Sequence, residues 1–106
     1  MKAVISYHVS HERTDRMGAI LSSVGIGEIV NVFAYKNDLG PTEWCITDTG
    51  ILVVRNPYTM RIVTAYALRI NQAVAIYKSH GFGRVPARIM NAVYNNERKR
   101  PYLYEN

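Results

Sequence analysis

The stretch that decides the fold covers residues 44–66 and reads WCITDTGILVVRNPYTMRIVTAY. It contains three short runs rich in Val, Ile, Thr and aromatic residues, which favour β-strands. Pro57 has a fixed φ and no backbone N–H, so it suits a turn after Asn56, and Gly50 supplies the positive φ that a connection after Asp48 requires. The stretch therefore predicts a β-meander of two successive hairpins, in which residues 45–47 pair with a strand over 51–55.

The segment before the meander contains one clear helical pattern. Its apolar residues are spaced three and four positions apart and predict a helix over 9–24 that packs on one face of the sheet through Met17, Ile20, Leu21 and Val24. Residues 28–35 fit either a second short helix or a strand, because periodicity does not separate the two. Residues 38–41 have the composition of a loop.

The segment after the meander predicts two further helices, over 68–78 and 86–95, each with an apolar stripe. Gly81 is placed to end the first of them. The predicted fold class is α+β: an N-terminal helix, or two, packs on an antiparallel three- to four-stranded β-meander, and two C-terminal helices follow. The 106 residues form a single domain with a core over 4–67, a helical extension over 68–97 and a flexible tail over 98–106.

Composition limits the cellular setting and the class of protein. Apolar residues make up 48% of the chain and charged residues 20%, as in ordinary globular proteins. The longest apolar run, residues 51–54, is far too short to cross a membrane, and the N-terminus becomes polar too early for a signal peptide. A lone Cys45 excludes an internal disulfide. We therefore expect a cytoplasmic protein with no membrane partner.

Charge is distributed unevenly along the chain. Residues 1–50 contain 4 Lys or Arg against 6 Asp or Glu, whereas residues 51–106 contain 9 against 2, so the two halves carry −2 and +7. A basic half with interleaved tyrosines is typical of a surface that meets phosphates, although it also fits a soluble protein with a basic tail. The candidate nucleic-acid-binding side chains are Arg13, Arg61, Arg69, Arg84 and Arg88.

Two of the three histidines, His8 and His11, lie beside Arg13 and Arg16. Histidine is suited to proton transfer near neutral pH, and a nearby arginine stabilises the charge that develops on a phosphate. Together they suffice to cleave RNA through its 2′-hydroxyl without a metal ion, although two histidines among polar residues are also common by chance. The histidines lack the spacing and the cysteine partners of a zinc site, so we expect no metal and no other cofactor.

The last strand of the meander carries a second candidate group. Strict alternation along residues 61–66 places Ile62, Thr64 and Tyr66 on one face of the sheet. Thr64 and Tyr66 could then present two hydroxyls to a phosphate, although both are also ordinary strand residues.

Three segments together resemble a known family. They are Ser6 to Arg16 with His8, Glu12 and Arg13, then residues 48–54, then Thr59 to Tyr66. They resemble the small ribonuclease-like group that unites barnase, EndoU, colicin nuclease and RelE-type toxin domains, and especially its short bacterial and phage-encoded members. The resemblance covers residues 4–67. It implies that His8 carries proton transfer, that Arg16 binds the phosphate, and that Thr64 and Tyr66 complete the site.

These observations leave three functions open. The first is a metal-independent, toxin-type endoribonuclease that leaves a 2′,3′-cyclic phosphate. The second is a non-catalytic, phage-encoded inhibitor that binds a host defence complex or nucleic acid through its basic half. The third is DNA binding through the two C-terminal helices as a helix-turn-helix. RNA is the expected partner, while an antitoxin, a host protein and a homodimer also stay open.

Overall fold

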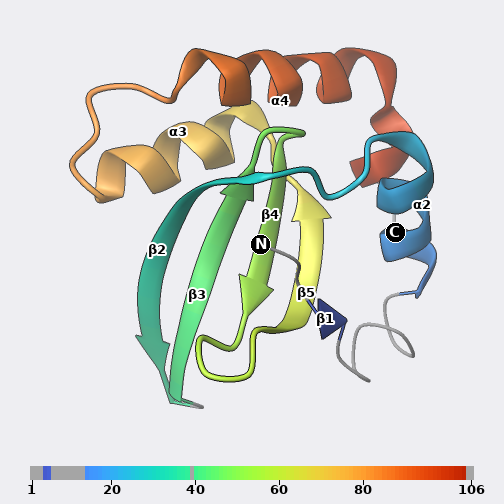
Figure 1. Ribbon diagram of the computed structural model, residues 1–106. Coiled ribbons are helices and arrows are strands. Elements are labelled where there is room, and N and C mark those ends of the chain that lie inside the picture. The colour runs from blue at the N-terminus through green and yellow to red at the C-terminus, as the bar shows by residue number, and fades with distance from the viewer. Residues whose placement is uncertain (1–3, 6–13, 39, 105–106) are drawn as a thin grey trace.

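The computed structural model describes residues 4–5, 14–38 and 40–104. Its elements are β1 (Val4–Ile5), α2 (Thr14–Ser23), β2 (Ile29–Asn37), β3 (Gly40–Thr47), β4 (Ile51–Arg55), β5 (Arg61–Ala67), α3 (Ile70–Ser79), α4 (Ala87–Lys99) and the 3-10 helix η1 (Pro101–Tyr104). They form one sheet with the strand order β1-β5-β4-β3-β2, in which β2 to β5 are antiparallel and β1 is parallel to β5 (Figure 1). The α+β prediction is confirmed, with α2 before the antiparallel strands and two helices after them.

The meander has the predicted pairing. Cys45 lies opposite Val53 and Ile46 opposite Leu52, so the predicted contact between residues 45–47 and β4 is confirmed. Strand β3 begins at Gly40, which turns part of the expected loop over 38–41 into strand. The segment over 28–35 was left open by its periodicity, and its residues 29–35 belong to β2, because their backbone pairs with β3 over most of its length.

Strand β5 departs from strict alternation. Val54 lies opposite Thr64, but its neighbour Arg55 lies opposite Ile62, so Val63 is an extra residue that forms a β-bulge. Ile62 therefore packs with Ala65 in one core cluster, whereas Tyr66 packs against the other. The prediction that Ile62 shares a face with Thr64 and Tyr66 is wrong, because the bulge reverses the direction of the side chains that precede it.

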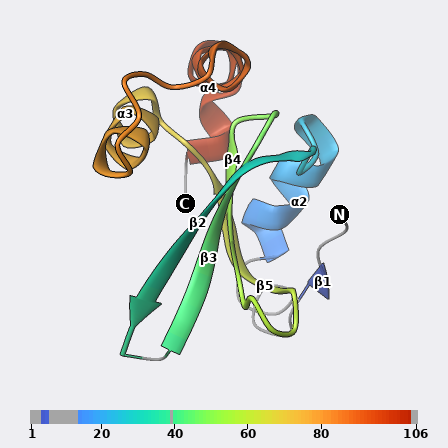
Figure 2. The same ribbon diagram turned by 60° about the vertical axis from the view of Figure 1, so that its left-hand side comes forward.

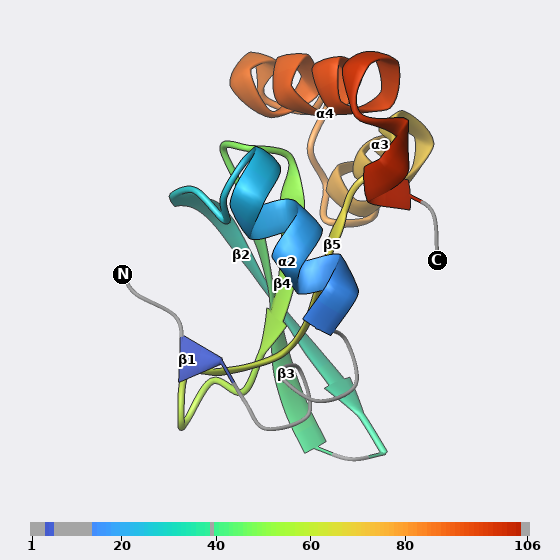
Figure 3. The ribbon, with the colours of Figure 1, turned by 90° about the vertical axis from the view of Figure 1, so that its right-hand side faces the viewer.

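Helix α2 covers one face of the sheet (Figures 2 and 3). Ile20 is buried there with Cys45 and Val53, and Val24 packs against the same cluster. Leu21 was expected in this stripe but is 49% exposed, because it lies about 100° around the helix from Ile20. The side chain of Met17 and residues 9–13 of the predicted helix lie outside the part of the chain that the structure describes.

Helices α3 and α4 lie on the other face, toward one end of the sheet (Figure 2). Leu52 of β4 packs in one buried cluster with Tyr77 of α3 and with Ile89 and Val93 of α4. The two helices therefore complete a second core rather than forming an extension beside the first. None of the helices in the described ranges is long and apolar enough to cross a membrane.

More of the C-terminal segment forms helix than its composition predicts. Helix α4 continues to Lys99, where the sequence predicts an end near residue 95. In η1, Leu103 is buried in the cluster that contains Ile20, and the Tyr104 hydroxyl donates a hydrogen bond to the Leu68 carbonyl at 2.8 Å. In the predicted flexible tail, residues 98–99 therefore belong to α4 and residues 101–104 to η1, which Leu103 anchors to the core.

Candidate nucleic-acid interface

The predicted catalytic residues are only partly described. His8, His11 and Arg13 lie outside the described residues. Arg16 lies in α2, and its side chain is likewise outside the description. Thr64 and Tyr66 lie on β5, where the structure places both.

Thr64 and Tyr66 share one face of β5. Tyr66 packs against the cluster under α3 and α4, and Thr64 lies opposite Val54 of that cluster. The Thr64 hydroxyl is buried and has no hydrogen-bond partner within the described ranges. Helix α2, which carries Arg16, packs on the opposite face through Ile20. Convergence of the histidines with these hydroxyls depends on residues outside the description, so it stays a prediction.

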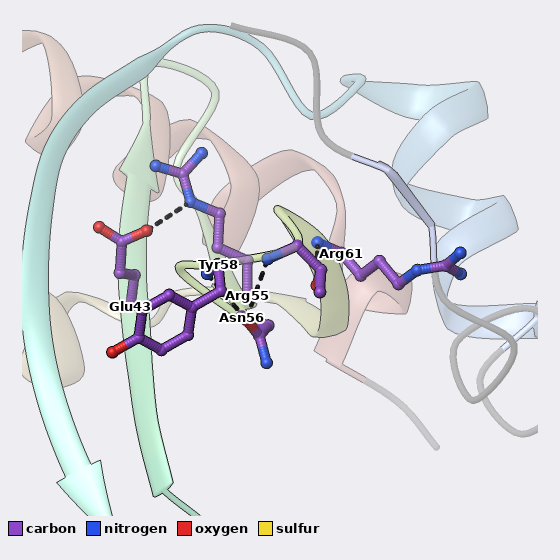
Figure 4. A network of polar contacts seen from close by, with 6 residues as sticks. Glu43, Arg55, Asn56, Tyr58 and Arg61 are labelled. Atoms are coloured by element: carbon purple, nitrogen blue, oxygen red, sulfur yellow. Dashed lines mark hydrogen bonds and ion pairs between the residues drawn. The ribbon is translucent and has the colours of Figure 1, made fainter.

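A charged pair occupies the strands β3 and β4. Arg55 Nε donates to Glu43 Oε1 at 3.0 Å, and the side chains are 4% and 23% exposed. Figure 4 shows the pair beside the turn after β4, where Asn56 Oδ1 accepts the backbone N–H of Tyr58 at 2.8 Å. The exposed side chain of Arg61 extends away from the pair. Arg55 is thus buried against a carboxylate, whereas Arg61 is accessible to a phosphate.

Among the residues whose side chains the structure describes, the helical layer, residues 68–104, carries most of the exposed positive charge. It contains seven basic residues and one acid, Glu97. Six of the basic side chains are exposed and are called here the helical cations: Arg69, Lys78, Arg84, Arg88, Arg98 and Lys99. Glu97 accepts the Ile70 backbone N–H at 3.4 Å and lies 4.0 Å from Arg69, so its carboxylate is engaged within the layer. Arg69, Arg84 and Arg88, predicted to bind nucleic acid, are accessible for that role.

The outer face of α4 adds polar groups to these cations. Ile89, Val93 and Asn96 point into the protein, while Arg88, Asn91, Asn95 and Arg98 recur along the exposed side. Arg98 also lies over the Tyr94 ring, 5.3 Å from its centroid. Arginine and asparagine are side chains that bind phosphates and base edges.

Helices α3 and α4 do not have the arrangement of a helix-turn-helix. They run in opposite directions with residues 80–86 between them, whereas the two helices of that motif cross (Figure 1).

Six rings form a continuous cluster between β2, β3 and α3, called here the ring cluster. Its members are Phe33, Tyr35, Trp44, Tyr77, His80 and Phe82. The His80 ring stacks on Phe33 with centroids 4.2 Å apart, and Tyr35 lies 4.2 Å from Trp44 in a tilted stack. Phe33 and Tyr77 are buried, whereas Tyr35, Trp44 and His80 are half-buried and Phe82 is 40% exposed. The cluster thus has a buried layer and an accessible one.

The end of α3 holds His80 and Phe82 in place. The Phe82 N–H donates to the Tyr77 carbonyl at 3.0 Å and the Gly81 N–H to the Lys78 carbonyl at 3.0 Å, which is a Schellman motif. Gly81 has φ +84°, as its predicted place at the helix end requires. His80 Nδ1 lies 2.9 Å from the Ile76 carbonyl oxygen and 3.1 Å from Ser79 Oγ, and these contacts hold the ring at the end of α3.

Tyr77 connects the ring cluster to the helical cations. Its hydroxyl donates to Asn31 Oδ1 at 2.6 Å. Burial raises the pKa of Tyr77 to about 12, and the positive charge of Arg88 acts against this rise. Arg88 therefore lies close enough to the cluster for its charge to act there.

Sequence reasoning overlooked the ring cluster and the polar face of α4. Phe33 and Tyr35 alternate in a segment that could have been helical, so no face could be assigned to them. Trp44 entered the prediction as the first residue of the meander stretch and His80 as one of the three histidines weighed for a zinc site, neither of them as part of an aromatic cluster. Once β2 was known to pair with β3, with Trp44 opposite Phe33, strand alternation would have placed Tyr35 on the same face as a diagonal neighbour of Trp44.

Comparisons with known proteins add no family. No protein-family model matches the chain, and the curated proteins and solved structures contain no significant match. Within the described ranges, no group of three or more His, Cys, Asp or Glu is arranged to hold a metal ion.

Proposed function

We propose that this protein binds RNA through the helical cations. The observation that carries the proposal is the charge balance of the helical layer, in which six exposed cations accompany a single acid, Glu97. Because Glu97 is engaged with Ile70 and Arg69, it offers little repulsion to a phosphate backbone. Arg88 and Arg98 lie on the same side of α4, about 15 Å apart along its axis, and can reach separate phosphates.

The binding should depend steeply on salt, because each neutralised phosphate releases counterions. Replacing both Arg84 and Arg88 by alanine should reduce the slope of log affinity against log salt by about one unit per lost phosphate contact. Fluorescence anisotropy with labelled RNA at several salt concentrations measures this slope. Lys36→Ala is the matched control, since Lys36 is an exposed cation on β2. Affinity that does not change with salt would contradict the proposal and favour an apolar protein partner.

The activity that we propose for the bound RNA is cleavage without a metal ion, of the toxin type. Its support is the combination of His8, His11 and Arg16 in the sequence and the resemblance to small ribonucleases. The protein should convert RNA into fragments with 2′,3′-cyclic phosphate ends in the presence of EDTA. Analysis of the products by electrophoresis and mass spectrometry tests this, and RNA that stays intact at saturating protein would refute cleavage.

A non-catalytic inhibitor of a host defence complex is the second candidate function. The observation that favours it is the placement of α2 on the face opposite Thr64 and Tyr66. If the catalytic groups do not meet, the basic surface would serve binding alone. Tight binding of RNA that remains intact would support this alternative.

A further inference from the structure

Four members of the ring cluster, Tyr35, Trp44, His80 and Phe82, are partly exposed at the surface of the protein. Tyr35 and Trp44 come from adjacent strands, and His80 and Phe82 come from the end of α3. The Tyr35 ring meets the His80 ring edge to face with centroids 5.2 Å apart, and Phe82 is linked to them through Phe33, which both His80 and Phe82 contact.

Three of the helical cations lie near His80 and Phe82 along the chain. Lys78, Arg84 and Arg88 are exposed and lie in the same segment as His80 and Phe82. The charge of Arg88 also acts on the hydroxyl of Tyr77, whose ring contacts Phe33 and Phe82. Aromatic rings beside cations are the combination that proteins use to hold single-stranded nucleic acid, in which the bases stack on the rings and the cations bind the phosphates.

Double-stranded RNA fits this surface poorly. Its bases are paired and stacked on one another, so their faces are not available to protein rings. An unpaired base can leave the strand and lie on a ring.

We propose that Tyr35, Trp44, His80 and Phe82 form a subsite that binds unpaired bases of single-stranded RNA. This inference rests on the proposed RNA-binding function and specifies its substrate. The cations beside the rings bind the flanking phosphates, and the rings select unpaired over paired strands.

Trp44 is the only tryptophan, so its fluorescence reports directly on this surface. The protein is titrated with 2′-O-methyl decauridylate, which lacks the hydroxyl needed for cleavage, and with an abasic sugar-phosphate chain of equal length. The uridylate should quench Trp44 in a saturable manner, whereas the abasic chain should bind more weakly and leave the fluorescence unchanged. A duplex of equal length should behave as the abasic chain does.

Two variants separate stacking from charge. Phe82→Ala should weaken uridylate binding about 5- to 100-fold, the effect expected for one stacked base, and leave binding of the abasic chain unchanged. Tyr58→Ala is the matched control, because Tyr58 is an exposed aromatic residue, 81% accessible, on the turn after β4. Circular dichroism establishes that both variants are folded.

The outcomes distinguish a failure of the base subsite from a failure of the RNA-binding function on which it rests. If the uridylate, the abasic chain and the duplex bind equally and Trp44 is not quenched, the base subsite is refuted while RNA binding stands. If none of them binds in an anisotropy measurement at low salt, RNA binding itself is refuted and the subsite with it.

Discussion

Gly50→Ala should destabilise the protein by about 2 to 5 kcal/mol, because two costs add at this position. Gly50 has φ +80°, a conformation that a residue with a Cβ rarely adopts. A Cβ there would also lie 3.1 Å from the Val93 backbone nitrogen and 3.1 Å from Asn96 Nδ2, and a backbone atom cannot easily move away. Urea unfolding at neutral pH measures the loss.

Gly81→Ala is the matched control for this substitution. Gly81 has almost the same φ, +84°, but a Cβ at this position would meet no neighbouring atom within 4 Å. Gly81→Ala should therefore destabilise the protein by only about 1 to 2 kcal/mol, which is the cost of a Cβ in the positive-φ conformation alone. Equal losses at the two glycines would show that the close approach of α4 to the turn between β3 and β4 adds nothing to stability.

The reason that Gly50 matters is the contact between α4 and this turn. Buried Asn96 donates through Nδ2 to the Thr49 carbonyl at 2.9 Å and accepts from Arg100 at 3.2 Å. The Leu68 N–H donates to the Gly50 carbonyl at 3.0 Å. The turn is thus held by the C-terminal helices, and displacing it would disturb the layer that carries the helical cations.

His8→Ala should slow RNA cleavage by on the order of 10²- to 10⁴-fold if His8 is the general acid or base. This corresponds to about 3 to 5 kcal/mol in the activation barrier. RNA affinity should change little, because the imidazole acts on the transferred proton rather than on the bound strand. Single-turnover cleavage at saturating protein, with affinity measured separately, tests both expectations.

Two further substitutions make the assignment specific. His11→Ala should retain activity if His8 is the acting histidine, and the reverse pattern would assign the role to His11. Arg16→Ala should reduce both cleavage and affinity, since it removes a phosphate ligand as well as transition-state charge stabilisation. Full activity of the double His8→Ala, His11→Ala variant would refute histidine catalysis in this protein.

The local elements were largely predictable. Asn56 and Pro57 mark the turn between β4 and β5, where Asn56 Oδ1 accepts the backbone N–H groups of Tyr58 and Thr59. Gly81 marks the end of α3 through its positive φ. Such signals arise from the φ preference or side-chain hydrogen bonding of single residues, so a sequence reveals them without knowledge of distant contacts.

The candidate site was predictable only in part. Arg69, Arg84 and Arg88 were expected to be available to nucleic acid, and all three are exposed. The ring cluster was not expected, because Phe33, Trp44 and His80 come from three elements whose proximity depends on sheet pairing and on where α3 ends. A sequence therefore reveals exposed charges that lie in one segment more readily than a cluster of rings that come from several elements.

The sequence by itself determined the α+β class, the order of the meander strands, the two C-terminal helices and the basic character of the second half. These follow from short-range periodicity, turn chemistry and composition. Tertiary structure alone decided that residues 29–35 form a strand, that Val63 forms a bulge which separates Ile62 from Thr64, and that Leu103 anchors η1 to the core. Each of these depends on pairing or burial against residues far along the chain, where the gain in contacts outweighs a weak or ambiguous local preference.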